Sequence, residues 1–171
     1  MKTLIIHPKD STTDFLSDIY SDKDWTVISS NKSKSELRRI IKSHDRIIML
    51  GHGSEDGLYD FTYKRFVIDS SWVQLLREKQ CVGIWCNANV FFEKYKLKGF
   101  YTGMIVSDID EAYYFSLTTD WDMIVESNSL LASSIKDSID SDDILTLVKS
   151  KYDVVGNKII DYNKHNLFYA D

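Results

Sequence analysis

The sequence is poor in basic residues, and this scarcity argues against one class of partner. Its 171 residues contain 21 Lys and Arg against 26 Asp and Glu, so the formal net charge is −5. A chain with this balance has no positive field to attract a phosphate backbone. Lys94, Lys96 and Lys98 come closest to a basic patch, but three lysines on a short polar segment are typical of a solvated face. We therefore expect no nucleic-acid partner.

Long hydrophobic runs are missing as well. The apolar runs stop after four to six residues, whereas a helix that spans a membrane needs about 20 apolar residues. The opening "MKTLIIHPKD" contains an apolar patch that is too short for the core of a signal peptide, and charged residues follow it at once. We therefore expect a cytoplasmic protein with no membrane contact.

Cysteine is rare, and its placement limits what it can do. The two cysteines, Cys81 and Cys86, lie five residues apart in one apolar segment. If that segment is a strand, the odd offset sends them to opposite faces, which argues against a disulfide between them. No Cys-x-x-Cys pair and no paired histidines occur, so we expect no metal site. We also expect no cofactor, because "HPKD" stands where a flavin- or nucleotide-binding protein would have a glycine-rich loop.

What the sequence does contain is an alternation of short apolar runs with amphipathic ones. Strands are predicted at 3–7, 25–29, 46–50, 81–85 and 100–107. Helices are predicted at 11–20, 33–44, 70–80, 89–96, 127–140 and 142–152. A hairpin or extended excursion is expected over 57–69, and a closing strand or extended tail from 157 onward.

This order of elements predicts the fold class. Repeated strand-helix-strand units favour a mostly parallel, doubly wound sheet with helices on both faces, which is a three-layer α/β/α fold. The unbroken apolar run at 46–50 indicates a strand that is covered on both sides. The length suits one domain with a full-sized core, so residues 1–171 are expected to form a single domain.

Chemically active side chains gather where the predicted strands end. In a parallel sheet the ligands lie beyond the carboxyl ends of the strands. His7 follows the first strand, and there we expect a structural role beside Pro8. The residues that follow the third, fourth and fifth strands are Gly51-His52-Gly53, Cys86-Asn87, and Asp108 with Asp110 and Glu111. The third and fourth strands thus bring a histidine and a cysteine to one edge.

A histidine beside a cysteine suits nucleophilic catalysis. A free thiol is mostly protonated at neutral pH, and a nearby imidazole raises its thiolate fraction and carries a proton to a leaving amine. The N–H groups of glycines beside His52 can approach a substrate carbonyl and form part of an oxyanion hole. Two simpler interpretations stay open, since cysteine is often a small buried hydrophobe and a histidine between glycines can simply occupy a turn.

The blocks "IIMLGHG" and "VGIWCNA" resemble those of the caspase-like cysteine peptidases, clan CD, which include caspases, gingipains, clostripain-type enzymes, legumain and separase. The resemblance covers residues 1–111 in element order, and its specific part is these two blocks. It implies a caspase-like domain that hydrolyses peptide bonds in a protein or peptide substrate. It assigns His52 as the general acid/base, Cys86 as the nucleophile and the Gly53 N–H to the oxyanion hole.

The chain also departs from that family. Ile84 stands two positions before Cys86, where clostripain-type members with basic specificity carry an acid, and the Gln-Ala-Cys signature of caspases is absent. The resemblance offers Asp108 and Asp110 as substrate-binding residues for an Arg or Lys side chain. Because the chain is short for a complete peptidase of this clan, the alternative is an inactive or partner-dependent caspase-like domain that binds proteins. A flavodoxin-like or receiver-like module is a third interpretation.

Overall fold

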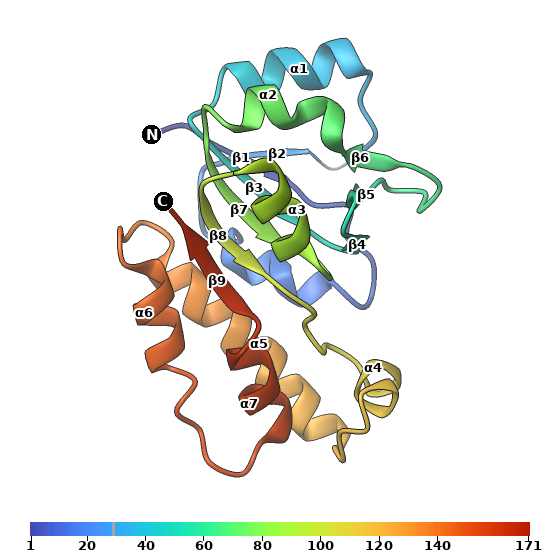
Figure 1. Cartoon of the computed structure of the whole chain (residues 1–171), viewed down its shortest axis with the longest axis vertical. Coiled ribbons are helices and arrows are strands. Elements are labelled where there is room, and N and C mark those ends of the chain that lie inside the picture. Colours follow the sequence, from blue (N-terminus) through green and yellow to red (C-terminus); the bar gives the residue numbers. More distant parts are fainter. Residues whose placement is uncertain (29) are drawn as a thin grey trace.

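A computed structural model describes residues 1–28 and 30–171 and contains two sheets (Figure 1). The larger sheet has the strand order β2-β1-β3-β7-β8-β9. Its first five strands run parallel, and β9 pairs antiparallel with β8. The strand bounds are β1 Thr3–Ile6, β2 Thr26–Ile28, β3 Arg46–Leu50, β7 Gln80–Ile84, β8 Gly99–Thr102 and β9 Leu167–Ala170.

Helices cover both faces of this sheet, so the molecule has three layers (Figure 1). One face carries α1 (Lys34–Lys42), the short 3-10 helix η2 (Ser70–Trp72), α2 (Val73–Leu76) and α3 (Ala88–Tyr95). The other face carries the 3-10 helix η1 (Asp14–Ile19), α5 (Trp121–Ser138), α6 (Ile144–Ser150) and α7 (Lys158–Lys164). Each face has its own apolar core. The predicted three-layer α/β/α fold with a mostly parallel sheet is confirmed.

The two central strands explain the unbroken apolar runs of the sequence. Every residue of β3 is buried, and β7 is buried from its second residue on. The two strands pair in parallel register up to Leu50 opposite Ile84. Apolar side chains on both sides of these strands are needed because both faces of the sheet are covered. The register also brings the carboxyl ends of β3 and β7 side by side.

A second, smaller sheet follows β3. It contains β4 (Gly53–Ser54), β5 (Gly57–Tyr59) and β6 (Phe66–Ile68), which pair antiparallel in that order. The expected hairpin over 57–69 is therefore confirmed, with one additional strand. Gly57 has φ +145°, and a Cβ there would lie 2.0 Å from the Ile68 carbonyl oxygen, so only glycine fits. The Trp85 indole N–H donates to the Ser54 carbonyl at 3.0 Å and ties this sheet to the end of β7.

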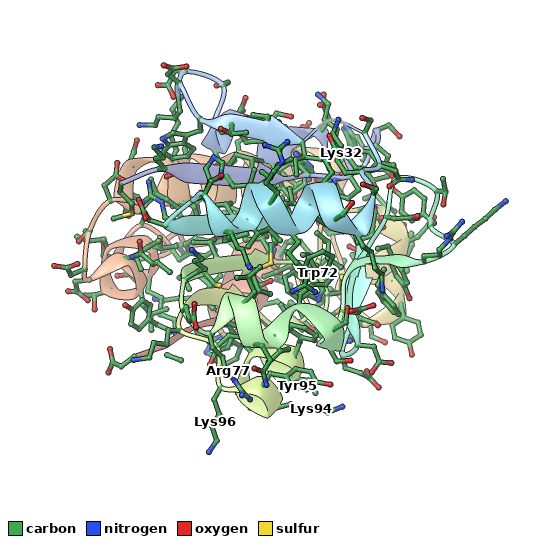
Figure 2. The ribbon with its side chains drawn as sticks, turned by 90° about the horizontal axis from the view of Figure 1, so that it is seen from above. Lys32, Trp72, Arg77, Lys94, Tyr95 and Lys96 are labelled. Atoms are coloured by element: carbon green, nitrogen blue, oxygen red, sulfur yellow. The ribbon has the colours of Figure 1, made fainter. Side chains whose placement is uncertain are left out.

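Helix ends are satisfied by specific donors and acceptors. Ser33 caps α1 by accepting a hydrogen bond from the Glu36 N–H at 3.2 Å, as its Ser-x-x-Glu pattern predicts. On the same face of the sheet, Arg77 Nε donates to the carbonyl of Tyr95, the last residue of α3, at 2.8 Å. Figure 2 labels this pair where α2 meets α3. The bond satisfies one of the carbonyls that a helix end leaves unpaired.

Three expected elements differ in type or length. The segment 11–20 contains a 3-10 helix in place of an α-helix, and the segment 70–80 forms only the short η2 and α2. The strand expected over 100–107 begins at Gly99 and ends at Thr102. The last residue of the strand expected over 25–29, Ser29, lies outside the described residues.

Capping residues explain the differences in the second half of the chain. The helix α4 (Ile109–Tyr114) was not expected, and Asp108 caps it by accepting from the Glu111 N–H. Asp120 caps α5, which therefore begins at Trp121, six residues earlier than expected. Asn157 accepts from two N–H groups at the start of α7, so the first half of the expected closing strand is a helix and only β9 is extended. Among the helices of the described residues, none is long and apolar enough to cross a membrane.

A buried arginine at the start of β3 joins the sheet to α5, and it yields a stability prediction. Arg46, 3% exposed, donates to Thr3 Oγ1 at 3.1 Å and to the Ile139 carbonyl at 2.8 Å, and it pairs with the exposed Asp140. Arg46→Ala is expected to lower the free energy of unfolding by about 3 kcal/mol, because buried acceptors lose a charged donor. Urea denaturation measures this. Asp140→Ala should cost much less, since water screens that pair; equal losses would contradict the argument.

Candidate active site

His52 is held in place by residues that follow β1. It comes directly after the β3 strand and Gly51, whose φ of +136° requires glycine. The Nε2 atom of His52 lies 2.8 Å from Thr12 Oγ1 and 3.4 Å from Asp10 Oδ2. The Tyr63 ring lies against the imidazole with a centroid distance of 5.6 Å. The imidazole is therefore fixed on one side by a turn and on another by an aromatic ring.

The hydrogen-bond network favours one tautomer of His52. Thr12 Oγ1 donates its proton to Asp10 Oδ1 at 2.9 Å, so toward His52 the same oxygen acts as an acceptor. The proton of the imidazole then lies on Nε2, and Nδ1 carries the free lone pair. Nδ1 is the atom of His52 that can accept a proton.

Asp10 is the anionic centre of this network. Its Oδ1 accepts from the backbone N–H groups of Thr12 and Thr13, which closes a tight turn after β1. Its Oδ2 accepts from the Tyr63 hydroxyl at 2.5 Å. Burial alone would raise the pKa of Asp10, but the hydrogen bonds from Tyr63 and Thr12 outweigh it and hold that pKa well below its usual range. The same contact and burial raise the pKa of Tyr63.

Cys86 lies two residues beyond the end of β7, at the start of α3. The preceding residue, Trp85, is buried, and its carbonyl accepts from Thr102 Oγ1 and from the Ala88 N–H. The following residue, Asn87, has a positive φ of 65° and forms the turn into α3. The thiol itself is partly buried. Both neighbours are thus anchored, which fixes the direction in which Cys86 leaves the sheet.

His52 and Cys86 line one small cavity of about 30 Å³, which Gly51, Trp85 and Glu111 also line. This volume is close to that of one or two water molecules. Within the described residues the imidazole is hydrogen-bonded to Thr12 and not to the thiol. The structure therefore brings the two side chains to one cavity, whose volume is too small for a peptide.

Burial, together with the negative charges of Glu111 and, more weakly, Asp108, raises the pKa of the Cys86 thiol to about 12, and the Ile105 N–H opposes this rise. Burial also raises the pKa of Glu111, whose carboxylate accepts from the Ser107 N–H at 2.7 Å. In this arrangement the thiol is protonated at neutral pH. Cys81 is fully buried within β7 and has no access to the cavity.

Gly53 lies one residue beyond the cavity lining, in β4. The His52 carbonyl accepts from the Tyr59 N–H at 2.9 Å, so His52 and Tyr59 form a hydrogen-bonded pair. Because such pairs alternate along antiparallel strands, Gly53 opposite Leu58 falls in a non-hydrogen-bonded position, and its N–H points away from β5. A Cβ on Gly53 would lie 2.2 Å from Trp85 Cδ1. Glycine is therefore required here by the packing of Trp85.

The acidic residues after β8 have different positions. Asp108 directs its carboxylate to the Glu111 N–H at 2.8 Å and caps α4, and Asp110 is exposed and does not line the cavity. Glu111, which was not singled out as a site residue, is the acid that lines it.

His7 forms a hydrogen bond through Nδ1 with the Tyr20 hydroxyl at 2.9 Å, and this bond does not involve His52. The contact fits the structural role expected for His7. Among the described residues, no group of three His, Cys, Asp or Glu is placed to hold a metal ion.

Three further site residues were missed from the sequence, namely Asp10, Thr12 and Tyr63, whereas Glu111 was placed at this edge without a role. Asp10 and Thr12 follow the first strand, at the same edge as the other site residues, so their position was a usable signal. Nothing in the sequence marks Tyr63, which reaches Asp10 from a turn 53 residues away.

Comparisons with models of known families, with curated proteins and with solved structures found no match for this chain.

The protonated thiol leads to a prediction on reactivity. In a Cys81→Ala background at pH 8, Cys86 is expected to react with iodoacetamide at least about 100-fold more slowly than a free cysteine, because only the thiolate reacts. Glu111→Gln should accelerate the reaction several-fold by removing a nearby negative charge. Asp110→Asn, which neutralises an exposed acid of the same segment, is the matched control. Fast alkylation of the parent protein would show that the Cys86 thiol is not held in its protonated form.

His7 leads to a prediction on stability. Burial lowers the pKa of His7 from 6.5 to about 4. As the pH falls, His7 therefore binds a proton in the unfolded chain before it does so in the folded protein. The free energy of unfolding should then fall by about 3 kcal/mol, because of this residue, as the pH drops from about 6.5 to 4. Denaturant titrations across that range measure the slope. His7→Asn should flatten it and the exposed His165→Asn should not; an unchanged slope in His7→Asn would contradict the assignment.

Proposed function

We propose that this protein is a caspase-like cysteine peptidase in which His52 is the general acid/base and Cys86 the nucleophile. One observation supports it most: the two side chains line one cavity at the adjoining ends of β3 and β7. The tautomer of His52 adds support, because Nε2 is held by Thr12 and Asp10 while Nδ1 keeps its lone pair. The resemblance of the two sequence blocks points to the same pair.

The proposed reaction moves one proton through the imidazole. Cys86 Sγ attacks the carbonyl carbon of a peptide bond while its proton passes to His52 Nδ1. The Gly53 N–H donates to the oxygen that becomes negatively charged. His52 then gives the proton to the leaving amine, and the C–N bond breaks to leave a thioester. Water, deprotonated by His52, hydrolyses the thioester and restores the thiol.

The raised pKa of the thiol sets the conditions for this reaction. A thiol with a pKa of about 12 does not provide a standing thiolate at neutral pH. Attack therefore has to be coupled to proton transfer to His52, and the small cavity has to widen for a peptide. Movement of α4 would widen the cavity and, since it carries Glu111 away from the thiol, would also lower the pKa of the thiol. The substrate is thereby proposed to be a peptide segment that displaces this helix.

Covalent labelling tests the proposal. Peptide chloromethyl ketones with Lys, Asp or Leu next to the reactive group are incubated with the native protein, and mass spectrometry identifies the modified residue. At least one is expected to label Cys86, and His52→Ala should slow that labelling at least about 100-fold, since general-base assistance is lost. His165→Ala, at an exposed histidine, is the matched control. Labelling no faster than that of an exposed thiol, and equal in His52→Ala, would sink the catalytic proposal.

The second candidate is a non-catalytic domain of the same fold that binds a protein partner. The observation that favours it is the small cavity with a protonated thiol beside Glu111. In that case His52, Asp10 and Tyr63 form a structural network that fixes the turn after β1 against the small sheet. The labelling experiment separates the two candidates, because a binding domain gives no His52-dependent modification.

A further inference from the structure

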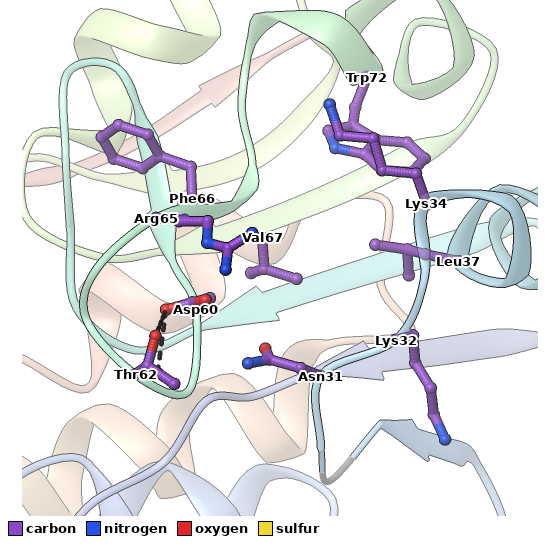
Figure 3. A pocket seen from close by; sticks show the side chains of 10 residues that line it. All are labelled: Asn31, Lys32, Lys34, Leu37, Asp60, Thr62, Arg65, Phe66, Val67 and Trp72. Atoms are coloured by element: carbon purple, nitrogen blue, oxygen red, sulfur yellow. Dashed lines mark hydrogen bonds between the residues drawn. The ribbon is translucent and has the colours of Figure 1, made fainter.

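A second and larger cavity, of about 260 Å³, lies between α1, η2, β6 and the turn 60–65 (Figure 3). It shares no lining residue with the cavity of His52 and Cys86. Its lining residues come from two stretches that are distant in sequence, 31–37 and 60–72, so the tertiary fold creates it. None of the proposed catalytic steps uses it.

The lining of this cavity is positively charged. Lys32, Lys34 and Arg65 contribute three cations, against the single carboxylate of Asp60. Asp60 is already engaged, because its Oδ1 accepts from the Thr62 N–H at 2.9 Å and from the Thr62 hydroxyl at 2.8 Å. Lys32 pairs with Glu36 at 3.7 Å. The ion pairs among the described residues include neither Lys34 nor Arg65.

The remaining wall is apolar. Leu37 and Trp72 are each 3% exposed and face the cavity together with Val67. In Figure 3, Arg65 and Lys34 lie on opposite sides of Val67. Figure 2 shows Lys32 and Trp72 on the same face of the molecule, near α1 and α2. The cavity thus combines two unpaired cations with an aromatic and aliphatic surface.

We propose that this cavity binds a small molecule that joins one anionic group, a phosphate or a carboxylate, to an apolar body. Arg65 supplies a forked donor that matches either anion, and Lys34 supplies a second positive charge. Leu37, Val67 and Trp72 contact the apolar body. The volume lies just below the range usual for drug-sized ligands, which suits a single ring with one anionic substituent.

Such a ligand would act on the turn that supports His52. Asp60, Thr62 and Arg65 line the cavity, and Tyr63, between them, donates to Asp10 and lies against His52. An anion on Arg65 fixes this turn and with it the contacts of Tyr63. This consequence for His52 rests on the proposed function, whereas binding itself does not. Binding is therefore tested without any activity measurement.

The test uses phenyl phosphate, benzoate and the uncharged benzyl alcohol. Each is titrated into the 15N-labelled full chain, and the indole N–H signal of Trp72, assigned with Trp72→Phe, is followed by NMR. Phenyl phosphate, benzoate or both should shift this signal with a dissociation constant in the low millimolar range or tighter, and benzyl alcohol should not. The two anions distinguish a phosphate ligand from a carboxylate ligand.

Charge-removing variants complete the test. Arg65→Gln should weaken binding of the anion about tenfold, and Arg65→Gln with Lys34→Gln should abolish it. Both positions are exposed, so the fold is retained. Lys64→Gln removes a neighbouring exposed cation that does not line the cavity and should leave binding unchanged. Absence of any shift, equal binding of benzyl alcohol, or full binding by the double variant would overturn the proposal.

Discussion

The parallel pairing of β3 with β7 is the constraint on which the candidate site depends. These two strands are buried on both faces and run in register to their last residues, Leu50 and Ile84. Whatever follows them must leave the sheet at neighbouring points. Cores on both sides of the sheet fix this pairing, because a slip of one residue would send every side chain of a strand into the opposite core. The placement of His52 and Cys86 at one cavity therefore follows from the buried centre of the sheet.

Burial stabilises this arrangement and at the same time suppresses the reactivity of the thiol. At a pKa of about 12, roughly one thiol in 10⁵ is ionised at pH 7. Two carboxylates near the thiol, those of Glu111 and Asp108, act in the same direction. The proton acceptor of the proposed reaction, His52, already lines the cavity, so what the site lacks is room for a substrate. The carboxylate of Glu111 comes from α4, which is six residues long and is held at its start by the Asp108 cap.

Much of the fold could be predicted from the sequence, because apolar runs and capping patterns are local signals. The run at 46–50 gave β3 at its observed bounds, and Ser33 with Glu36 marked the start of α1. The failures have physical causes. Asp120 and Asn157 are caps without the capping-box glutamate, so the first turns of α5 and all of α7 were missed or misassigned. Asp108 does have Glu111 three positions later, so the start of α4 carried this local signal and was missed all the same. His52 and Cys86 were found because strand ends share an edge, whereas the Tyr63 contact depends on tertiary folding.

Three adjacent strands each contribute one part of the candidate site, in spatial order. The turn after β1 supplies Asp10 and Thr12, β3 leads to His52, and β7 leads to Cys86. The turn after β1 holds Nε2 of the His52 imidazole in place. The direction in which the free lone pair of Nδ1 points is therefore set by a segment that contains neither His52 nor Cys86. Tyr63 ties the small sheet to the same carboxylate. Because Asp10 receives donors from two separate segments, the orientation of the proposed base depends on both of them and responds to a change in either.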